Sequence, residues 1–193
     1  TGVTKLYAGP TAATLSLSDT HLAGASLTPT YASASFTSKN AGAAKTVNVT
    51  GISLSGTDAA NSSPNATATA TADITTRSLT VSATGVNKMY DGTTTATVTL
   101  ADNRLPGDSL LPAYTTASFA DRNIGTAKPV SVSGISLGGT DAANYQLAGN
   151  SATTTANITT KALSVSGITA DNKVYDGTTS ATVNVSGATL AGL

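Results

Sequence analysis

The sequence predicts an all-β fold made of tandem β-sandwich repeats. Three observations predict it. Apolar residues alternate with threonine or serine over short stretches, no stretch shows the 3.6-residue apolar periodicity of a helix, and long motifs recur at a fixed spacing. Alanine, serine and threonine dominate the composition, and small or β-branched residues of this kind suit strands that surround a thin core.

Composition excludes several classes of function. The 193 residues carry ten basic and ten acidic side chains, so the net charge of +0 argues against unspecific binding of nucleic acid or anionic membranes. Cysteine is absent, which excludes disulfides and thiolate chemistry, and the single histidine, His21, excludes a multi-histidine metal site. No stretch approaches the ~18 apolar residues of a membrane span. We therefore expect no enzyme activity, no catalytic residue, no cofactor and no membrane-spanning segment.

The strongest signal in the sequence is internal repetition. Residues 84–93 recur at 170–178, residues 51–61 recur at 134–144, and residues 72–77 recur at 156–161. The offset of roughly 83 to 85 residues matches a small domain and exceeds a typical solenoid repeat. We predict three parts, cut from a longer array. They are a first repeat that lacks its opening strand (1–77), a complete repeat (78–161) and the truncated start of a third repeat (162–193).

Each repeat is predicted to contain about seven short strands. Ala96, Val98 and Leu100 share one face of a strand, with threonines on the other. A later strand changes its inward-facing parity at Gly134, and the first repeat changes at Gly51. A glycine at a one-residue slip of the inward face is typical of a β-bulge, so we expect a bulge at both glycines.

A corner motif favours an immunoglobulin-like sandwich. The run Asp141–Tyr145 follows one strand and precedes another, and such sandwiches turn this corner with a tyrosine whose hydroxyl bonds back across it. The predicted corner residues are Asp141, Asn144 and Tyr145. A β-grasp-like repeat is the alternative, but it requires a helix within residues 101–113, where two prolines and a glycine disfavour one.

Two Tyr-Asp-Gly sequences are the most tempting binding residues. They are Tyr90, Asp91, Gly92, Tyr175, Asp176 and Gly177. We interpret them as a structural turn motif, because glycine supplies a positive φ and aspartate bonds to its own backbone. The alternative is that these loops bind a glycan or a protein, since tyrosine is a frequent contact residue at such sites.

Two weaker chemical hypotheses remain open. Asp58 with Asn61, Asp141 with Asn144, and Asp171 with Asn172 offer oxygen ligands for Ca²⁺, although each pair falls short of the six to eight that the ion prefers. Lys5, Lys88 and Lys173 recur before the tyrosines, and a lysine beside an asparagine and a carboxylic acid is the residue set of an isopeptide cross-link. A solvated lysine with a packed stem is the simpler interpretation.

The motifs resemble a known family. Lys88–Thr94, Phe119–Gly125, Gly139–Tyr145 and Ala156–Lys161 are similar to the YDG-type repeats of very large bacterial surface proteins, which are related to filamentous haemagglutinin and other secreted or autotransported adhesins. The resemblance spans essentially the whole chain, and it departs at Ala8, Pro10 and Ser62 of the first repeat. It implies an extracellular repeat on the bacterial cell surface, associated with the outer membrane, without enzymatic activity.

We therefore expect spacer repeats in the stalk of an adhesin that supports cell adhesion or biofilm formation. No glycine- or serine-rich linker separates the repeats, which suggests restricted hinges and a semi-rigid array. The expected partners are the flanking repeats of the same polypeptide, with surface glycans or proteins of host or neighbouring cells as partners under the binding alternative.

Overall fold

The computed structural model describes residues 1–192 and is almost entirely β. Within these residues it contains twenty strands and two 3₁₀ helices but no α-helix, so the all-β prediction is confirmed. The segment 101–113 holds the end of β10 (Thr97–Asp102), a turn at Gly107 with a φ of +88°, and β11 (Leu111–Ala113). The helix that the β-grasp alternative requires is not there, and that alternative is wrong.

Residue contacts divide the chain into two compact units. The first contains residues 1–83, 100–116 and 132–152, and the second contains residues 84–99 and 117–131 with the described part of 153–193. The first unit therefore holds the whole of the predicted first repeat and one end of the predicted second repeat. The predicted boundaries at residues 77 and 161 stay a prediction, because these units group residues by contact and not by sequence repeat.

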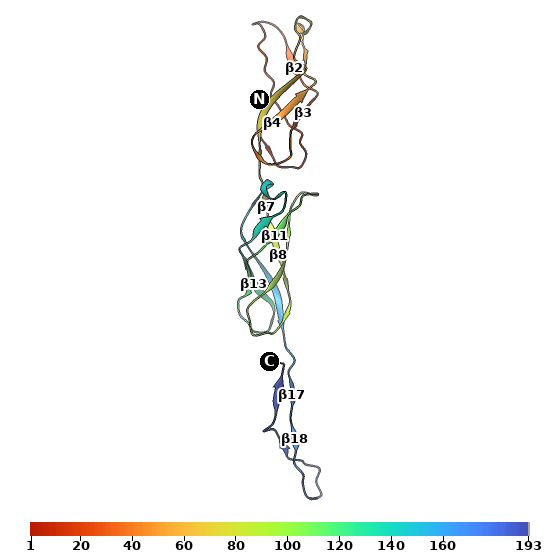
Figure 1. Cartoon of the computed structure of the whole chain (residues 1–193), viewed down its shortest axis with the longest axis vertical. Coiled ribbons are helices and arrows are strands. Elements are labelled where there is room, and N and C mark those ends of the chain that lie inside the picture. Colours follow the sequence, from red (N-terminus) through yellow and green to blue (C-terminus); the bar gives the residue numbers. More distant parts are fainter. Residues whose placement is uncertain (193) are drawn as a thin grey trace. The chain divides into compact units, whose positions relative to one another are not determined.

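A four-stranded sheet forms the centre of the first unit. Its order is β1 (Lys5–Leu6), β6 (Thr67–Thr75), β4 (Gly42–Thr50) and β3 (Ser33–Phe36); β1 runs parallel to β6, and the other neighbours are antiparallel. Alternation sets the buried face, because successive side chains of a strand point to opposite sides. Figure 1 shows β4 beside β3. Val47 and Val49 are buried on β4 while their neighbours Asn48 and Thr50 are exposed.

Gly51 marks a one-residue slip as well as a change of sheet. Thr50 pairs with Thr67, but the next bond to that strand runs from the Ile52 N–H to the Ala66 carbonyl oxygen, so Gly51 is the extra residue. It lies between β4 and β5 (Ser53–Ser55), has a φ of +66°, and lets the chain leave the four-stranded sheet to pair with β2 (Thr28–Thr30). A second irregularity in the β4–β6 ladder lies between Gly42 and Lys45, where Ala44 adopts a φ of +48°. The slip predicted at Gly51 is therefore confirmed, and the second repeat has the equivalent bond beyond Gly134, from the Ile135 N–H to the Asn150 carbonyl oxygen.

The rest of the first unit comes from the predicted second repeat. β7 (Arg77–Leu79) runs parallel to β15 (Tyr145–Leu147), and β11 pairs antiparallel with β14 (Ser136–Gly138). The 3₁₀ helix η2 (Ala142–Asn144) turns the chain into β15, as η1 (Ala59–Asn61) turns it after β5. This end of the repeat, formed by residues 105–110 and 141–145, is called the corner below.

The remaining strands belong wholly or in part to the second unit, and β8 and β10 are shared equally with the first. One sheet has the order β12 (Thr116–Phe119), β13 (Gly125–Ser133), β16 (Ser151–Thr159) and β9 (Lys88–Met89). The other pairs are β8 (Val81–Val86) with β10, β17 (Ser164–Ser166) with β20 (Thr189–Ala191), and β18 (Thr169–Ala170) with β19 (Val183–Asn184). Nine strands, β8–β16, lie wholly within residues 78–161, so the expected number of seven is too low.

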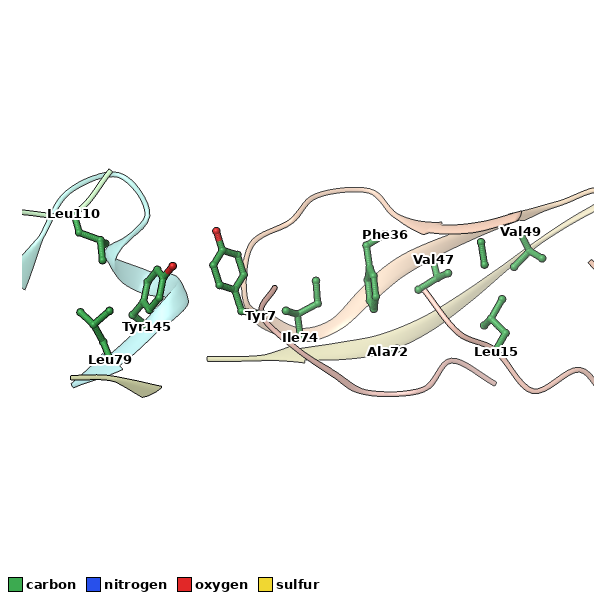
Figure 2. Close-up of a cluster of buried hydrophobic side chains, with 11 residues drawn as sticks. Tyr7, Leu15, Phe36, Val47, Val49, Ala72, Ile74, Leu79, Leu110 and Tyr145 are labelled. Carbon is green, nitrogen blue, oxygen red and sulfur yellow. The ribbon is translucent and has the colours of Figure 1, made fainter. Parts of the chain in front are cut away.

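A buried apolar cluster occupies the first unit and positions the site. Figure 2 shows Tyr7 at one end of a row of side chains that includes Phe36, Ile74 and Val47, with Tyr145 facing it. Leu79 and Leu110 flank Tyr145 on the other side. The segment 162–192, by contrast, is exposed along its full described length. Over residues 1–192 no helix is both long and apolar enough to cross a membrane.

Candidate functional site

One cluster of ionisable side chains joins the two repeats within the first unit. The Asp108 cluster consists of Tyr7, Lys39, Asp108, Asp141 and Tyr145. Tyr7 follows β1 and Lys39 follows β3, both in the predicted first repeat; the other three residues belong to the corner of the second repeat. The contacts therefore bridge about a hundred residues of chain and fix one repeat against the corner of the next.

Asp108 is the centre of the cluster. Its carboxylate accepts hydrogen bonds from the Tyr7 hydroxyl at 2.8 and 2.9 Å and from the Tyr145 hydroxyl at 2.6 Å. The Lys39 ammonium lies 2.8 Å from Asp108 and 2.8 Å from Asp141, so it bridges the two carboxylates. The Asp108 side chain is only 4% exposed, and a charge this well buried is tolerated because a cation and two hydroxyls satisfy it.

Aromatic and apolar contacts surround these bonds. The rings of Tyr7 and Tyr145 meet edge to face, with centroids 5.5 Å apart and planes at 73°, an arrangement that aromatic pairs favour. Leu79 and Leu110 are buried beside Tyr145 (Figure 2). Apolar packing beside Asp108 and the two tyrosines limits the access of water to their hydrogen bonds and strengthens them, while the Lys39 side chain stays 38% exposed.

Asn144 supplies a second link across the joint. It is 2% exposed, and its side-chain oxygen accepts the backbone N–H of Ala41 at 2.9 Å. Its amide nitrogen lies 3.4 Å from the side-chain oxygens of Asn40 and Asp141. The other oxygen of Asp141 accepts the backbone N–H of Ser109 at 3.0 Å, which ties the two loops of the corner together.

The pKa directions follow from these contacts. Burial raises the pKa of Asp108, but the hydrogen bonds from Lys39, Tyr145 and Tyr7 outweigh burial and hold it below its usual value. The bond from Lys39 likewise lowers the pKa of Asp141, and the two carboxylates raise the pKa of Lys39. Burial, and then the bond to Asp108, raises the pKa of both tyrosines. At neutral pH the cluster therefore holds two carboxylates, one ammonium and two neutral phenols.

Each Tyr-Asp-Gly sequence forms a turn closed by a lysine. One Asp91 oxygen accepts the backbone N–H and the hydroxyl of Thr93, each at 2.9 Å, and the Lys88 ammonium at 2.8 Å. These bonds lower the pKa of Asp91 to about 2, with Lys88 the largest cause. Gly92 has a φ of +77°, which favours glycine.

The second sequence repeats this turn. Asp176 accepts Thr178 twice at 2.9 Å and Lys173 at 2.7 Å, and Gly177 has a φ of +74°. In the first repeat, where Ala8 stands for the aspartate, Lys5 instead donates to the carbonyl oxygens of Pro10 and Ala12 at 2.6 and 3.0 Å. The three recurring lysines thus bond to the loops that follow them.

The three tyrosines of this motif differ in exposure. Tyr7 is fully buried under the corner, Tyr90 is half-buried, and Tyr175 is 92% exposed. The turn chemistry is therefore shared, while the environment of the tyrosine depends on what covers it. Among residues 1–192 no group of three or more His, Cys, Asp or Glu side chains is placed to hold a metal ion.

Sequence reasoning missed Asp108, Lys39 and Tyr7 as partners. Recurrence guided the search, but aligning the two repeats places Ala25 at the position of Asp108 and Ser62 at that of Tyr145. One signal in the sequence could have found the site. Tyr145 is replaced by Ser62 in the first repeat, so the tyrosine is a feature that only the second corner has.

The single histidine has a structural counterpart. His21 contacts Asp19, and the aligned positions in the second repeat hold Arg104 and Asp102, whose side chains pair at 2.5 and 2.7 Å. The Arg104 guanidinium also donates to the carbonyl oxygen of Leu110 at 2.7 Å. The same loop thus carries a pair of oppositely charged residue types in both repeats, so His21 occupies a position that pairs with an aspartate in each.

The comparisons with known proteins identify the family. The model of the YDG domain matches residues 1–70, 75–156 and 159–193, which is nearly the entire chain in three consecutive copies. The chain belongs to the YDG domain family. No curated protein and no solved structure matches the chain. The Asp108 cluster thus lies between the first and second of three YDG domains, and the Tyr-Asp-Gly turns are the residues that name them.

Proposed function

We propose that these YDG domains are structural spacers that act by holding consecutive domains in a fixed arrangement. The observation that carries the proposal is the Asp108 carboxylate, which binds side chains of two domains with 4% of its own side chain exposed. A joint made of buried charge-assisted bonds and edge-to-face rings resists bending more than a solvated linker does.

The chemistry of the joint also supports a role without catalysis. General acid–base work needs a carboxyl group that can reach a substrate. Both oxygens of Asp108 accept hydrogen bonds from tyrosine or lysine side chains, and Asp141 bonds to Lys39 and to the backbone of Ser109. From the resemblance of the motifs to adhesin repeats, we propose that the parent protein lies on a bacterial surface and that the spacer presents its adhesive region for attachment or biofilm formation.

Pulsed EPR distances test the spacer proposal. The chain has no cysteine, so Leu22→Cys and Leu111→Cys give unique spin-label sites, at residues that are 84% and 69% exposed. We expect one narrow distance distribution that broadens in the Asp108→Ala background. Asp121→Ala is the matched control, because that carboxylate is 52% exposed and lies outside the joint. A distribution that is already broad in the unaltered chain refutes the proposal.

A second candidate function is glycan or protein binding by the Tyr-Asp-Gly loops. The observation that favours it is the exposure of Tyr175, since open aromatic rings are typical contact residues. The test is a glycan array probed with the chain and with its Tyr90→Ala, Tyr175→Ala variant. Signals that the unaltered chain gives and the double variant lacks support binding. If neither chain gives a signal, the binding function is refuted and only the spacer function remains.

A further inference from the structure

A groove beside Tyr90 lies in the second unit. It encloses about 570 Å³, and its lining includes Tyr90, Asn123, Ile124, Thr160 and Leu163. Ile124 and Leu163 are 55% and 48% exposed, which is unusual for large aliphatic side chains grouped around one hollow. We call this hollow the Tyr90 groove.

The first unit contains the same residues in a covered state. Alignment of the repeats places Tyr7 at the position of Tyr90 and Leu79 at that of Leu163. Both Tyr7 and Leu79 are 0% exposed. The difference lies in what packs on them, because in the first unit the corner of the second YDG domain contributes Leu110, Asp108 and Tyr145 to their surroundings.

We propose that the Tyr90 groove is the docking site for the corner of another YDG domain, one that carries the aspartates, asparagine and tyrosine found at Asp108, Asp141, Asn144 and Tyr145. This inference rests on the proposed spacer function and extends it to a rule of partner choice. Residues 162–192 align with residues 78–107 and so contain no corner of their own.

Charge complementarity supports the same occupant. Arg122 aligns with Lys39, the cation that bridges Asp108 and Asp141, and Asn123 aligns with Asn40. Arg122 is exposed in the structure. A guanidinium presents several donors in a planar fork, so it suits a corner that presents two carboxylates at least as well as an ammonium does.

The first domain shows which corners do not fit. Its corner keeps Asp58, which accepts the backbone N–H of Ser26 at 2.8 Å just as Asp141 accepts that of Ser109. It holds Ala25 and Ser62 where the docking corner holds Asp108 and Tyr145. The bond from the aspartate to the neighbouring loop is therefore present with and without the docking side chains, and under this rule the two domains carry a docking and a non-docking corner.

An extended chain tests the docking rule. Residues 1–192 are continued with a second copy of residues 108–161, which completes the third domain with a docking corner because Gly192 aligns with Gly107. Amide exchange of Ile124 is the readout, since the aligned Ala41 donates its N–H to Asn144 across the first joint. We expect the Ile124 amide to exchange at least tenfold more slowly than in the unextended chain.

The matched control is the same extension with the copied Asp108 replaced by Ala and the copied Tyr145 replaced by Ser. These are the residues that the first corner holds, as Ala25 and Ser62. The control should leave Ile124 exchange unchanged. Equal slowing by both extensions, or slowing by neither, overturns the docking rule.

A variant of the natural chain guards against an extension that fails to fold. Asp108→Ala with Tyr145→Ser converts the first joint to a non-docking corner, and Ala41 exchange should then rise at least tenfold while the β4–β6 ladder stays protected. An Ala41 amide that stays protected contradicts the rule. The EPR experiment tests the spacer function separately. A broad distance distribution in the unaltered chain refutes the spacer function and does not affect the Ile124 exchange result.

Discussion

Removal of the Asp108 carboxylate is the sharpest test of how the joint is held. In Asp108→Ala, the fully buried Tyr7 loses the acceptor of its hydroxyl, and Tyr145 loses the acceptor of its proton. Tyr145 keeps the N–H of Leu105 as a donor at 2.9 Å, and Lys39 keeps Asp141. The change therefore removes the acceptor of the Tyr7 hydroxyl, which keeps only Lys39 as a neighbour, and leaves Tyr145 and Lys39 partly satisfied.

These losses set the expected magnitude. A buried polar group left unsatisfied costs about 1–3 kcal/mol, and a hydrogen bond to a charged acceptor contributes about 1.5–3 kcal/mol. Because Tyr145 and Lys39 keep other partners, we expect the joint to lose about 3 kcal/mol in the free energy of opening. That loss corresponds to roughly a hundredfold change in the opening equilibrium, since each 1.4 kcal/mol is a factor of ten.

Native-state hydrogen exchange measures this opening at one atom. The Ala41 N–H donates to Asn144 across the joint, so its exchange reports whether the corner is docked. We expect about hundredfold faster exchange in Asp108→Ala and about tenfold in Asp108→Asn, whose amide oxygen still accepts both hydroxyls without the charge. The amides of β4 should not change. If Ala41 accelerates less than threefold while the chain stays folded, Asp108 does not hold the joint and the reasoning fails.

Three further predictions concern pH and the turns. Because the pKa of Asp108 is lowered, the stabilisation it gives is present above the unfolded pKa near 4 and is lost as the pH falls through the folded pKa. Because the pKa of Tyr7 is raised, the stabilisation it gives is present below about pH 10 and is lost as the pH rises through the folded pKa. Ala41 exchange, corrected for its intrinsic pH dependence, should show one plateau between these limits. Gly92→Ala should lower the free energy of unfolding by about 1 kcal/mol in a urea titration, because a Cβ there meets no atom within 4 Å and only the positive φ is strained. Gly149→Ala is the control and should have little effect, since that position is equally open and has no positive φ. Lys88→Met keeps the packed stem but removes the donor to the loop carbonyls, so amides of the following turn should exchange faster with no change at Ala41; slower or equal exchange there contradicts the lysine's role.

Much of the local structure follows from the sequence because it is encoded locally. Alternation placed Ala96 and Val98 on one face of a strand, and the structure buries both. Turn chemistry was equally readable, since Asp91 bonds to a residue two positions away and Gly92 needs no partner at all. The slip at Gly51 was readable for the same reason, because a glycine at a change of parity is typical of a bulge. The pairing of β5 with β2 was not readable, because it depends on a partner distant in sequence.

The joint was hidden for a different reason. Asp108 meets Tyr7 over a separation of 101 residues, and no local pattern encodes that contact. A search for recurring residues finds the residues that every domain needs to fold. It passes over the residues of a joint, because only some domains have them. Asp141 recurs as Asp58 and shapes the corner; Asp108 does not recur.

This separation has a consequence for an array of YDG domains. The bond from Asp58 or Asp141 to the neighbouring loop is present in both domains, so it does not require the residues found at Asp108 and Tyr145. Under the docking rule two positions set whether a corner docks, while the recurring aspartate bond is kept in either case. A long array can then place stiff joints and loose joints at chosen points along one polypeptide, by two side chains per domain and without any change of linker length.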